Sequence, residues 1–164
     1  MAEFFVQWGG LSLALAGAGI AVILGGIGSS IGVGLAGQAG AGVVTEQPEK
    51  FGKVLVLEAL PGTQGIYGFL VAFLIILATG LLGGEAKELS MSQGWQLFFS
   101  CLPCGFACLF SGIHQGKVTS AGMNMVAKDG ANMGKAMVLS AMVETYAVLG
   151  FLVSALLIFF SGLM

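Results

Sequence analysis

The sequence is poor in charge and contains no arginine. Lysine supplies all six basic residues among 164, eight residues are acidic, and charged residues make up 9% of the chain. No basic stretch is long enough to follow a phosphate backbone, which excludes nucleic-acid binding. Nothing resembles a nucleophile paired with a base, which excludes a soluble enzyme. Because 57% of the residues are hydrophobic, the composition is that of a membrane protein.

Proline is also scarce, whereas glycine is abundant. Three prolines and 28 glycines in so apolar a sequence suit transmembrane helices, whose backbones glycine allows to approach closely. Ten of the glycines lie between residues 17 and 42, including the small-xxx-small pair Gly28 and Gly32. The glycine motif at 32–37 matches a dinucleotide-binding pattern only formally, because no strand precedes it. We therefore expect this first span to line the inside of a ring of protomers, with the second and fourth spans outside.

Four apolar stretches are each long enough to cross a bilayer. They run from about 9 to 44, 54 to 82, 95 to 116 and 136 to 164, with the charges gathered between them. The sequence thus predicts an all-α membrane protein with four transmembrane helices. A first hairpin, residues 1–83, would hold spans at about 9–46 and 50–83. Residues 84–91 would connect it to a second hairpin, residues 92–164, with spans at about 92–128 and 132–164.

The sequence repeats itself at an offset of 82 residues. Between 52–71 and 134–153, ten of the twenty aligned positions are identical and no gap is needed. Such a period indicates that one structural unit has been duplicated. The fold is therefore predicted to be a duplicated helical hairpin. Each copy holds two spans, so both copies must cross the membrane in the same direction.

The lysines predict how the chain is oriented. Five of the six lie toward the turns inside the two hairpins, and only Lys87 lies in the connecting segment. By the positive-inside rule these turns face the cytoplasm, and both termini lie on the non-cytoplasmic side of the cell membrane. The five are Lys50, Lys53, Lys117, Lys128 and Lys135.

Glu144 is exceptional among the acidic residues because apolar sequence flanks it on both sides. An intramembrane carboxylate indicates a functional site. In a helical hairpin, residues equidistant from the turn lie at the same level. With the turn near residues 129 and 130, Gln115 lies level with Glu144, about 22 Å along the helix from the turn at ~1.5 Å per residue.

The repeat places Gly62 at the same level on the second span. Pro61 lacks an N–H, so we expect it to free the carbonyl of Leu57 and to loosen the turn around Leu60. Polar groups follow the i, i+3, i+4, i+7 spacing of one helix face here. The face consists of Leu60, Thr63, Gln64 and Tyr67.

These groups together offer five or more oxygen atoms and a single negative charge. That inventory matches a dehydrated monovalent cation such as Na⁺, whose charge one carboxylate would neutralise. Two alternatives remain open: a proton carrier, which needs only Glu144 and one hydrogen-bond partner, and a polar network that only stabilises helix packing. The predicted Na⁺ ligands are the Leu60 carbonyl, Thr63, Gln64, Gln115 and Glu144, with Tyr67 beside them.

Two other features are interpreted as packing. Cys101, Cys104 and Cys108 lie at i, i+3 and i+7 in an apolar run without a nearby His or acidic partner, which favours helix packing over a metal site or a disulfide. His114 adjoins Gln115 but points about 100° around the helix from it. We interpret His114 as a packing or interface residue.

Three motifs carry a family resemblance. Leu60-Pro-Gly-Thr-Gln-Gly-Ile-Tyr-Gly68, Gly112-Ile-His-Gln-Gly-Lys117 and Met142-Val-Glu-Thr-Tyr-Ala-Val-Leu-Gly-Phe151 occur in order. They resemble the K, or proteolipid, rotor-ring subunit of bacterial V-type and V/A-type ATPases, above all the Na⁺-translocating branch. The resemblance covers nearly the whole chain. His114 stands where a small residue is expected, and the three cysteines are not part of the family pattern.

The resemblance implies a non-catalytic subunit that assembles into a homo-oligomeric ring in the lipid. A central stalk on the cytoplasmic side, driven by ATP hydrolysis, would turn this ring. Ions would exchange at a stator membrane subunit that contributes an arginine. The Na⁺ ligands of the family match the Leu60 carbonyl, Thr63, Gln64, Gln115 and Glu144, and Tyr67 matches a tyrosine bonded to the carboxylate.

Two other classes remain as alternatives. A small cation or drug exchanger also uses a membrane-embedded glutamate, but such transporters usually rely on inverted repeats, whereas this repeat is parallel. A purely structural pore or fusion-channel protein would require Glu144 to be dispensable.

Overall fold

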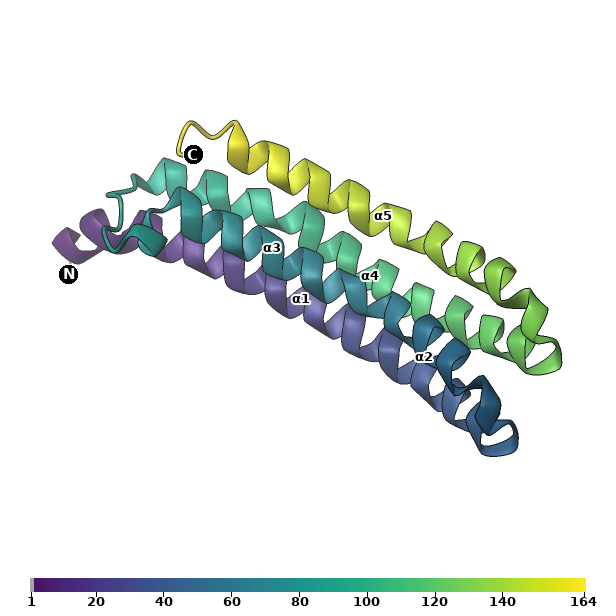
Figure 1. The fold of residues 1–164 in the computed structure, drawn as a ribbon. Helices are drawn as coiled ribbons and strands as arrows, with labels where there is room; N and C mark the ends of the chain where they lie inside the picture. The colour runs from purple at the N-terminus through teal and green to yellow at the C-terminus, as the bar shows by residue number, and fades with distance from the viewer. Residues whose placement is uncertain (1) are drawn as a thin grey trace.

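The computed structural model describes residues 2–164 and the side chains from Trp8 onward, so Met1 of the expected first hairpin lies outside the described residues. The described chain forms an elongated bundle of antiparallel helices (Figure 1). Its two ends lie at the same end of the bundle. Within the described residues, four helical stretches are long and apolar enough to cross a membrane: Trp8–Glu46, Pro48–Ala78, Met91–Lys128 and Gly130–Phe159. The expected all-α fold with four spans is confirmed.

The first hairpin consists of one long helix and one interrupted helix. Helix α1 covers Ala2–Glu46, and a 3-10 turn at Pro48–Lys50 reverses the chain. The returning span is divided into α2 (Phe51–Ala59) and α3 (Thr63–Ala78) by a 3-10 turn at Leu60–Gly62. This interruption occurs at Pro61, as expected from a proline without an N–H.

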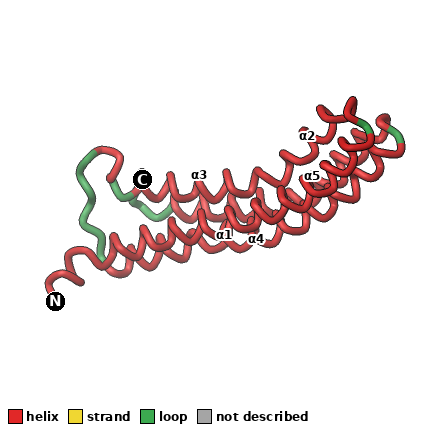
Figure 2. The backbone as a smooth tube through the Cα atoms, turned by 90° about the horizontal axis from the view of Figure 1, so that it is seen from below, coloured by secondary structure: helices red, strands yellow, loops and turns green. Residues whose placement is uncertain are grey.

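The second hairpin repeats this plan with two continuous helices. Helix α4 (Met91–Lys128) begins with a capping box, in which the Ser90 hydroxyl accepts from the Gln93 N–H at 3.2 Å and the Gln93 side chain accepts from the Ser90 N–H at 2.9 Å. After a turn at Gly130–Asn132, α5 covers Met133–Phe159. The segment that joins the hairpins contains a short 3-10 turn at Leu81–Gly83 (Figure 2).

Helices α1 and α4 lie side by side along the bundle, with α3 packed on α1 and α5 packed on α4 (Figures 1 and 2). Glycine makes the α1–α4 contact possible. A Cβ atom added to Gly28 would lie 2.5 Å from the carbonyl oxygen of Cys108 and 2.6 Å from that of Leu109, which is too close for any real side chain. A Cβ atom on Gly32 would likewise meet the Gly112 carbonyl oxygen, and one on Gly112 would lie 2.5 Å from the backbone of Gly28. The pair Gly28 and Gly32 therefore packs two helices within one protomer, whereas the sequence suggested contacts around a ring.

The outer surfaces of α3 and α5 are apolar. Large hydrophobic side chains remain exposed along both helices, far more than a water-soluble protein presents. On α3 they include Ile66, Phe69, Phe73 and Leu77, and on α5 Leu139, Met142, Leu149, Leu152 and Leu156. These faces suit contact with lipid or with other membrane-embedded surfaces.

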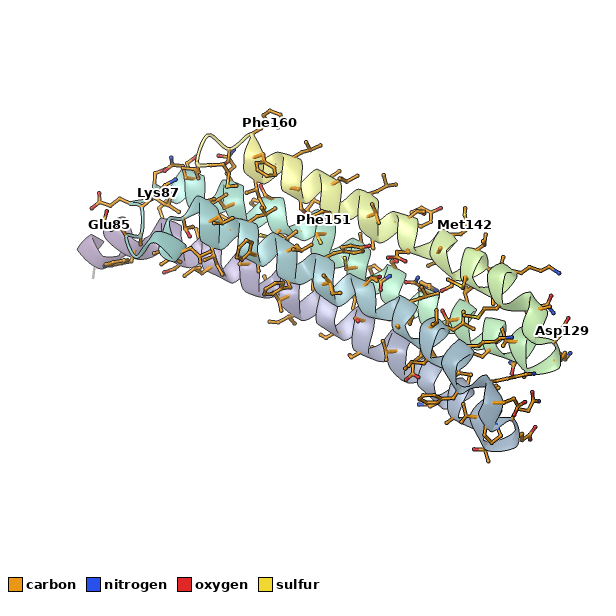
Figure 3. All side chains as sticks on the ribbon, in the orientation of Figure 1. Glu85, Lys87, Asp129, Met142, Phe151 and Phe160 are labelled. Carbon is orange, nitrogen blue, oxygen red and sulfur yellow. The ribbon has the colours of Figure 1, made fainter. Side chains whose placement is uncertain are left out.

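Charged residues gather at the two ends of the bundle, whereas Glu144 lies between them. Figure 3 labels Asp129 at one end and Glu85 and Lys87 at the other. Near the first of these, the Lys50 ammonium donates to the carbonyls of Val126 at 2.9 Å and Ala127 at 2.7 Å. Lysine at a helix C-terminus satisfies carbonyls that lack intrahelical partners. The lysines of this end therefore also join the two hairpins.

Replacing Gly28 with leucine should disrupt the protomer, because the new side chain would meet the backbone of α4. Gly134→Leu is the matched control, since a Cβ at Gly134 meets no described atom within 4 Å. Overpacking costs about 1–3 kcal/mol or more where the backbone cannot move. Limited proteolysis of detergent-solubilised protein should digest the Gly28 variant faster than the Gly134 variant. Equal protection of both would contradict the α1–α4 packing.

Candidate functional site

A cluster of polar side chains lies between α3, α4 and α5, about halfway along the bundle. Glu144 lies on α5 between Met142 and Phe151, both of which Figure 3 labels. Gln64 on α3 and Gln115 on α4 are fully buried. Buried carboxamides in an apolar bundle require hydrogen-bond partners, and here they find them in one another and in Glu144.

The Glu144 carboxylate is held from two helices. The Tyr67 hydroxyl of α3 donates to Oε1 at 2.8 Å, and the Gln115 amide of α4 donates to Oε2 at 3.2 Å. The Tyr67 ring stacks on Phe151, with ring centroids 5.8 Å apart, which fixes the direction of its hydroxyl. Each carboxylate oxygen thus has its own donor. The structure brings together Tyr67, Gln115 and Glu144, as the sequence analysis expected.

Gln64 extends the network to α3. Its Nε2 donates to the Gln115 Oε1 and, at 3.2 Å, to the Ser111 hydroxyl. Ser111 in turn donates to the carbonyl of Val143 on α5 at 2.9 Å. Sequence analysis missed Ser111. The signal was present, because Ser111 precedes Gln115 by four residues and so lies on the same face of α4.

The 3-10 turn supplies the backbone oxygen. The Leu60 carbonyl accepts from the Thr63 N–H and from the Thr63 hydroxyl, the latter at 3.0 Å. The Thr63 hydroxyl also lies 3.5 Å from Gln64 Oε1, so two oxygens of this turn, from Leu60 and Thr63, gather beside the buried amide. The expectation that Pro61 frees the Leu57 carbonyl is wrong. The chain tightens into a 3-10 turn, and the Leu60 N–H donates to that carbonyl.

Among the described residues, no hydrogen bond joins the residues interpreted as packing residues to this cluster. His114 is exposed on α4. Cys101, Cys104 and Cys108 are buried, and the sulfur atoms of Cys104 and Cys108 lie 3.6 Å apart. Within the described part of the chain, no group of three or more His, Cys, Asp or Glu residues could hold a metal ion. The cysteines therefore fill the core beside α1.

The arrangement offers one negative charge and several neutral oxygens at one level of the bundle. Leu60 and Thr63 do not contact Glu144 directly, but Gln64 and Gln115 connect them to it through the hydrogen bonds described above. Beside Glu144, the outer face of α5 carries an open hollow of about 480 Å³. The carboxylate is therefore partly accessible from the side. The hollow is lined by Ala141, Glu144, Thr145, Val148 and Leu149.

Comparison with known proteins identifies the family. A sequence model for the C subunit of ATP synthase matches the chain twice, at residues 16–75 and 98–157. The chain belongs to this family. The two matches begin 82 residues apart, as the internal repeat does. Members of the family are non-catalytic membrane proteins that form homo-oligomeric rings within ATPase complexes. The duplicated-hairpin fold and its ring assembly are thereby confirmed.

Some of the similar proteins match nearly the whole chain, and others match less than half of it. Subunit K of the V-type sodium ATPase of Enterococcus hirae is 46% identical over 158 residues, which cover 96% of this chain and 97% of that one. Subunit K of the A-type ATP synthase of Methanocaldococcus jannaschii is 47% identical over 148 residues, 90% of this chain and 62% of that one. Subunit c of the ATP synthase of Lachnoclostridium phytofermentans is 42% identical over 71 residues, 41% of this chain and 81% of that one. Within the family, the chain is a rotor-ring proteolipid of the V/A type.

A hydrophobic carbodiimide should modify Glu144 selectively. The reagent reacts with carboxyl groups in apolar surroundings, and the hollow beside Glu144 gives it access. Mass spectrometry of labelled protein should show the adduct in the parent chain and its loss in Glu144→Gln. Glu58→Gln is the control, because Glu58 lies on α2 against Gly37 and away from the cluster. Labelling that persists in the Glu144 variant would place the reactive carboxyl elsewhere.

Proposed function

We propose that this protein carries Na⁺ across the membrane, bound at Glu144, as the ring turns under ATP hydrolysis. The supporting observation is the set of neutral oxygens beside the carboxylate. A proton would need only Glu144 and one partner, whereas two buried carboxamides, a hydroxyl and a backbone carbonyl accompany it here. Such groups replace the water that Na⁺ loses on entering lipid.

The proposed ligands are the Leu60 carbonyl, Thr63, Gln64, Gln115 and Glu144. The Gln64 and Gln115 amides now bond to each other, so an entering cation would have to replace that hydrogen bond with contacts from both amide oxygens. Tyr67 would keep the carboxylate in position through its hydroxyl. Na⁺ with one carboxylate is electrically neutral. A neutral site can rotate past lipid without the cost of a bare charge.

The second candidate is a proton ring. Tyr67 and Gln115 already donate to both oxygens of Glu144, so the network is complete without a cation. We favour Na⁺ because this chain is 46% identical to a subunit of an enzyme named as a sodium ATPase, and because Gln64 has no task in a proton site.

The proposal includes an orientation in the cell membrane. The end that carries Lys50 and Asp129 would face the cytoplasm and contact the central stalk, with both termini on the other side. A stator membrane subunit would supply an arginine opposite Glu144, whose position on α5, near the exposed Met142 and Leu149, faces outward. An arginine there would displace Na⁺ from the carboxylate and so permit exchange.

Sodium should protect Glu144 from the carbodiimide, because cation and proton compete for one carboxylate. The protection should weaken as the pH falls, since protons then displace Na⁺. Gln64→Ala and Gln115→Ala each remove a ligand and should raise the Na⁺ concentration for half-protection about tenfold, equivalent to ~1.4 kcal/mol. Gln38→Ala, at an exposed position on α1, should leave it unchanged. Labelling that is indifferent to Na⁺ from neutral to mildly acidic pH would indicate a proton ring instead.

Each protomer should bind one Na⁺. Gly62 stands in the first hairpin where Glu144 stands in the second, so four helices share one carboxylate. Fewer ions then cross per turn, and the work of one turn can drive each against a steeper gradient, at ~2.3 kcal/mol per charge per 100 mV. This favours pumping over ATP synthesis. Counting bound ²²Na⁺ per chain in purified rings tests the proposal, and two ions per chain would refute it.

A further inference from the structure

Ser111 of α4 is buried and forms hydrogen bonds with two other helices. Its hydroxyl donates to the Val143 carbonyl of α5 at 2.9 Å and accepts from the Gln64 amide of α3 at 3.2 Å. A single hydroxyl therefore connects the three helices that form the polar cluster. Ser111 is nevertheless not one of the proposed Na⁺ ligands.

These two hydrogen bonds determine which way the Gln64 amide points. The Val143 carbonyl can only accept, so it takes the one hydroxyl proton of Ser111. The Ser111 oxygen is then left with lone pairs alone, and the amide atom that faces it must be the donor, Nε2. The second proton of Nε2 goes to the Gln115 Oε1. Both amide protons of Gln64 are thus directed toward α4.

The opposite side of the amide carries its oxygen. With its NH₂ group held by α4, Gln64 presents Oε1 to the Thr63 hydroxyl at 3.5 Å, and the same hydroxyl lies 3.0 Å from the Leu60 carbonyl oxygen. A hard cation binds an amide through the oxygen, because the NH₂ group offers only hydrogens. A reversed Gln64 amide would direct those hydrogens at the proposed ion site.

We propose that Ser111 is a positioning residue, which holds the Gln64 amide with its oxygen toward the ion site. The link to an ion rests on the proposed function, whereas the orientation of the amide does not. A cation that takes the Gln115 oxygen as a ligand would deprive Gln64 Nε2 of that acceptor. The hydrogen bond to Ser111 can persist, so the amide would keep its direction in the free and the loaded site.

The first hairpin contains the equivalent serine without an amide partner. Ser29 lies 82 positions before Ser111, and its hydroxyl donates to the Gly62 carbonyl at 3.0 Å. Among the hydrogen bonds of the described residues, none joins a side-chain amide to Ser29. Joining the two helices of a hairpin is therefore common to both serines. Holding an amide is what Ser111 adds.

The orientation of the amide can be tested without sodium. Magic-angle-spinning NMR of rings labelled with ¹⁵N in the glutamine side chains would report the Gln64 NH₂ group, whose signal Gln64→Ala identifies by its loss. Both of its protons are hydrogen-bonded, so they should exchange slowly with D₂O. Ser111→Ala removes one acceptor and should accelerate this exchange about tenfold, as expected for the loss of one buried hydrogen bond.

Ser140→Ala is the matched control. Ser140 of α5 is buried and shares a hydrogen bond of 2.6 Å with Thr119 of α4, so this variant also removes a hydroxyl that joins α4 to α5. Because that pair does not involve Gln64, exchange of its NH₂ group should remain as in the parent. Rapid exchange in the parent, or the same exchange in the Ser111 and Ser140 variants, would overturn the proposal.

A double-mutant cycle tests the link to the ion. Ser111→Ala should raise the Na⁺ concentration that half-protects Glu144 from the carbodiimide about tenfold, whereas Ser140→Ala should not. In a Gln64→Ala background, Ser111→Ala should have no further effect, because no amide is left to position. Additive losses would show that Ser111 acts through the packing of α4 on α5, and would overturn the proposal.

The two measurements separate this inference from the proposed function. If Na⁺ does not protect the parent, but Ser111→Ala still releases a protected Gln64 NH₂ group, then the positioning role stands and the Na⁺ function fails. If Na⁺ protects the parent and Ser111→Ala changes neither exchange nor protection, then the Na⁺ function stands and the positioning role fails.

Discussion

The rest of this structure depends on the need to accommodate a carboxylate midway through an apolar bundle. A charge in hydrocarbon costs several kcal/mol unless it is paired or hydrogen-bonded. Glu144 meets that requirement with donors on both oxygens, Tyr67 from α3 and Gln115 from α4. Three helices must therefore converge at one level within hydrogen-bonding distance. Any feature that separates α3 from α4 would deprive the carboxylate of a partner.

Glycine provides that convergence. Lipid is as apolar as leucine, so burying hydrophobic side chains does little to hold helices together within a membrane, and close van der Waals contact has to do so. Gly28 lies against the backbone of α4, while Gly25 lies 2.8 Å, measured from a Cβ built on it, from the Gln64 carbonyl oxygen of α3. The glycine-rich helix α1 thus packs closely against both α3 and α4, the two helices that carry the hydrogen-bond donors to Glu144. The glycines of α1 therefore support the Glu144 carboxylate of α5 indirectly, by positioning the helices that bond to it.

Much of the fold and of the polar cluster could be predicted from the sequence because the quantities that determine them are distances along the chain. Span length, the 82-residue repeat and distance from the turn are enough to place Gln115 level with Glu144 and Tyr67 on the facing helix. The sequence did not reveal the Leu60–Gly62 3-10 turn, because proline permits several local rearrangements and only packing selects one. Nor did it distinguish contacts within a protomer from contacts between protomers. Gly26 and Gly28 have similar sequence surroundings, yet Gly28 faces α4 whereas Gly26 faces away from it.

The duplicated halves also explain why the described residues form this polar cluster in one place. One local hydrogen bond is retained in both halves: the Thr63 hydroxyl donates to the Leu60 carbonyl at 3.0 Å, and the Thr145 hydroxyl donates to the Met142 carbonyl at 2.7 Å. The side chains that would complete a second polar cluster are absent from the corresponding positions. At the positions 82 residues away, Gly62 is equivalent to Glu144, Val33 to Gln115, Tyr146 to Gln64 and Leu149 to Tyr67. A single substitution at Gly62 would therefore place an acid among apolar groups without restoring a site. In the proposed site, the first hairpin would supply the oxygens of Leu60, Thr63 and Gln64, and the second would supply the oxygen of Gln115 and the charge of Glu144.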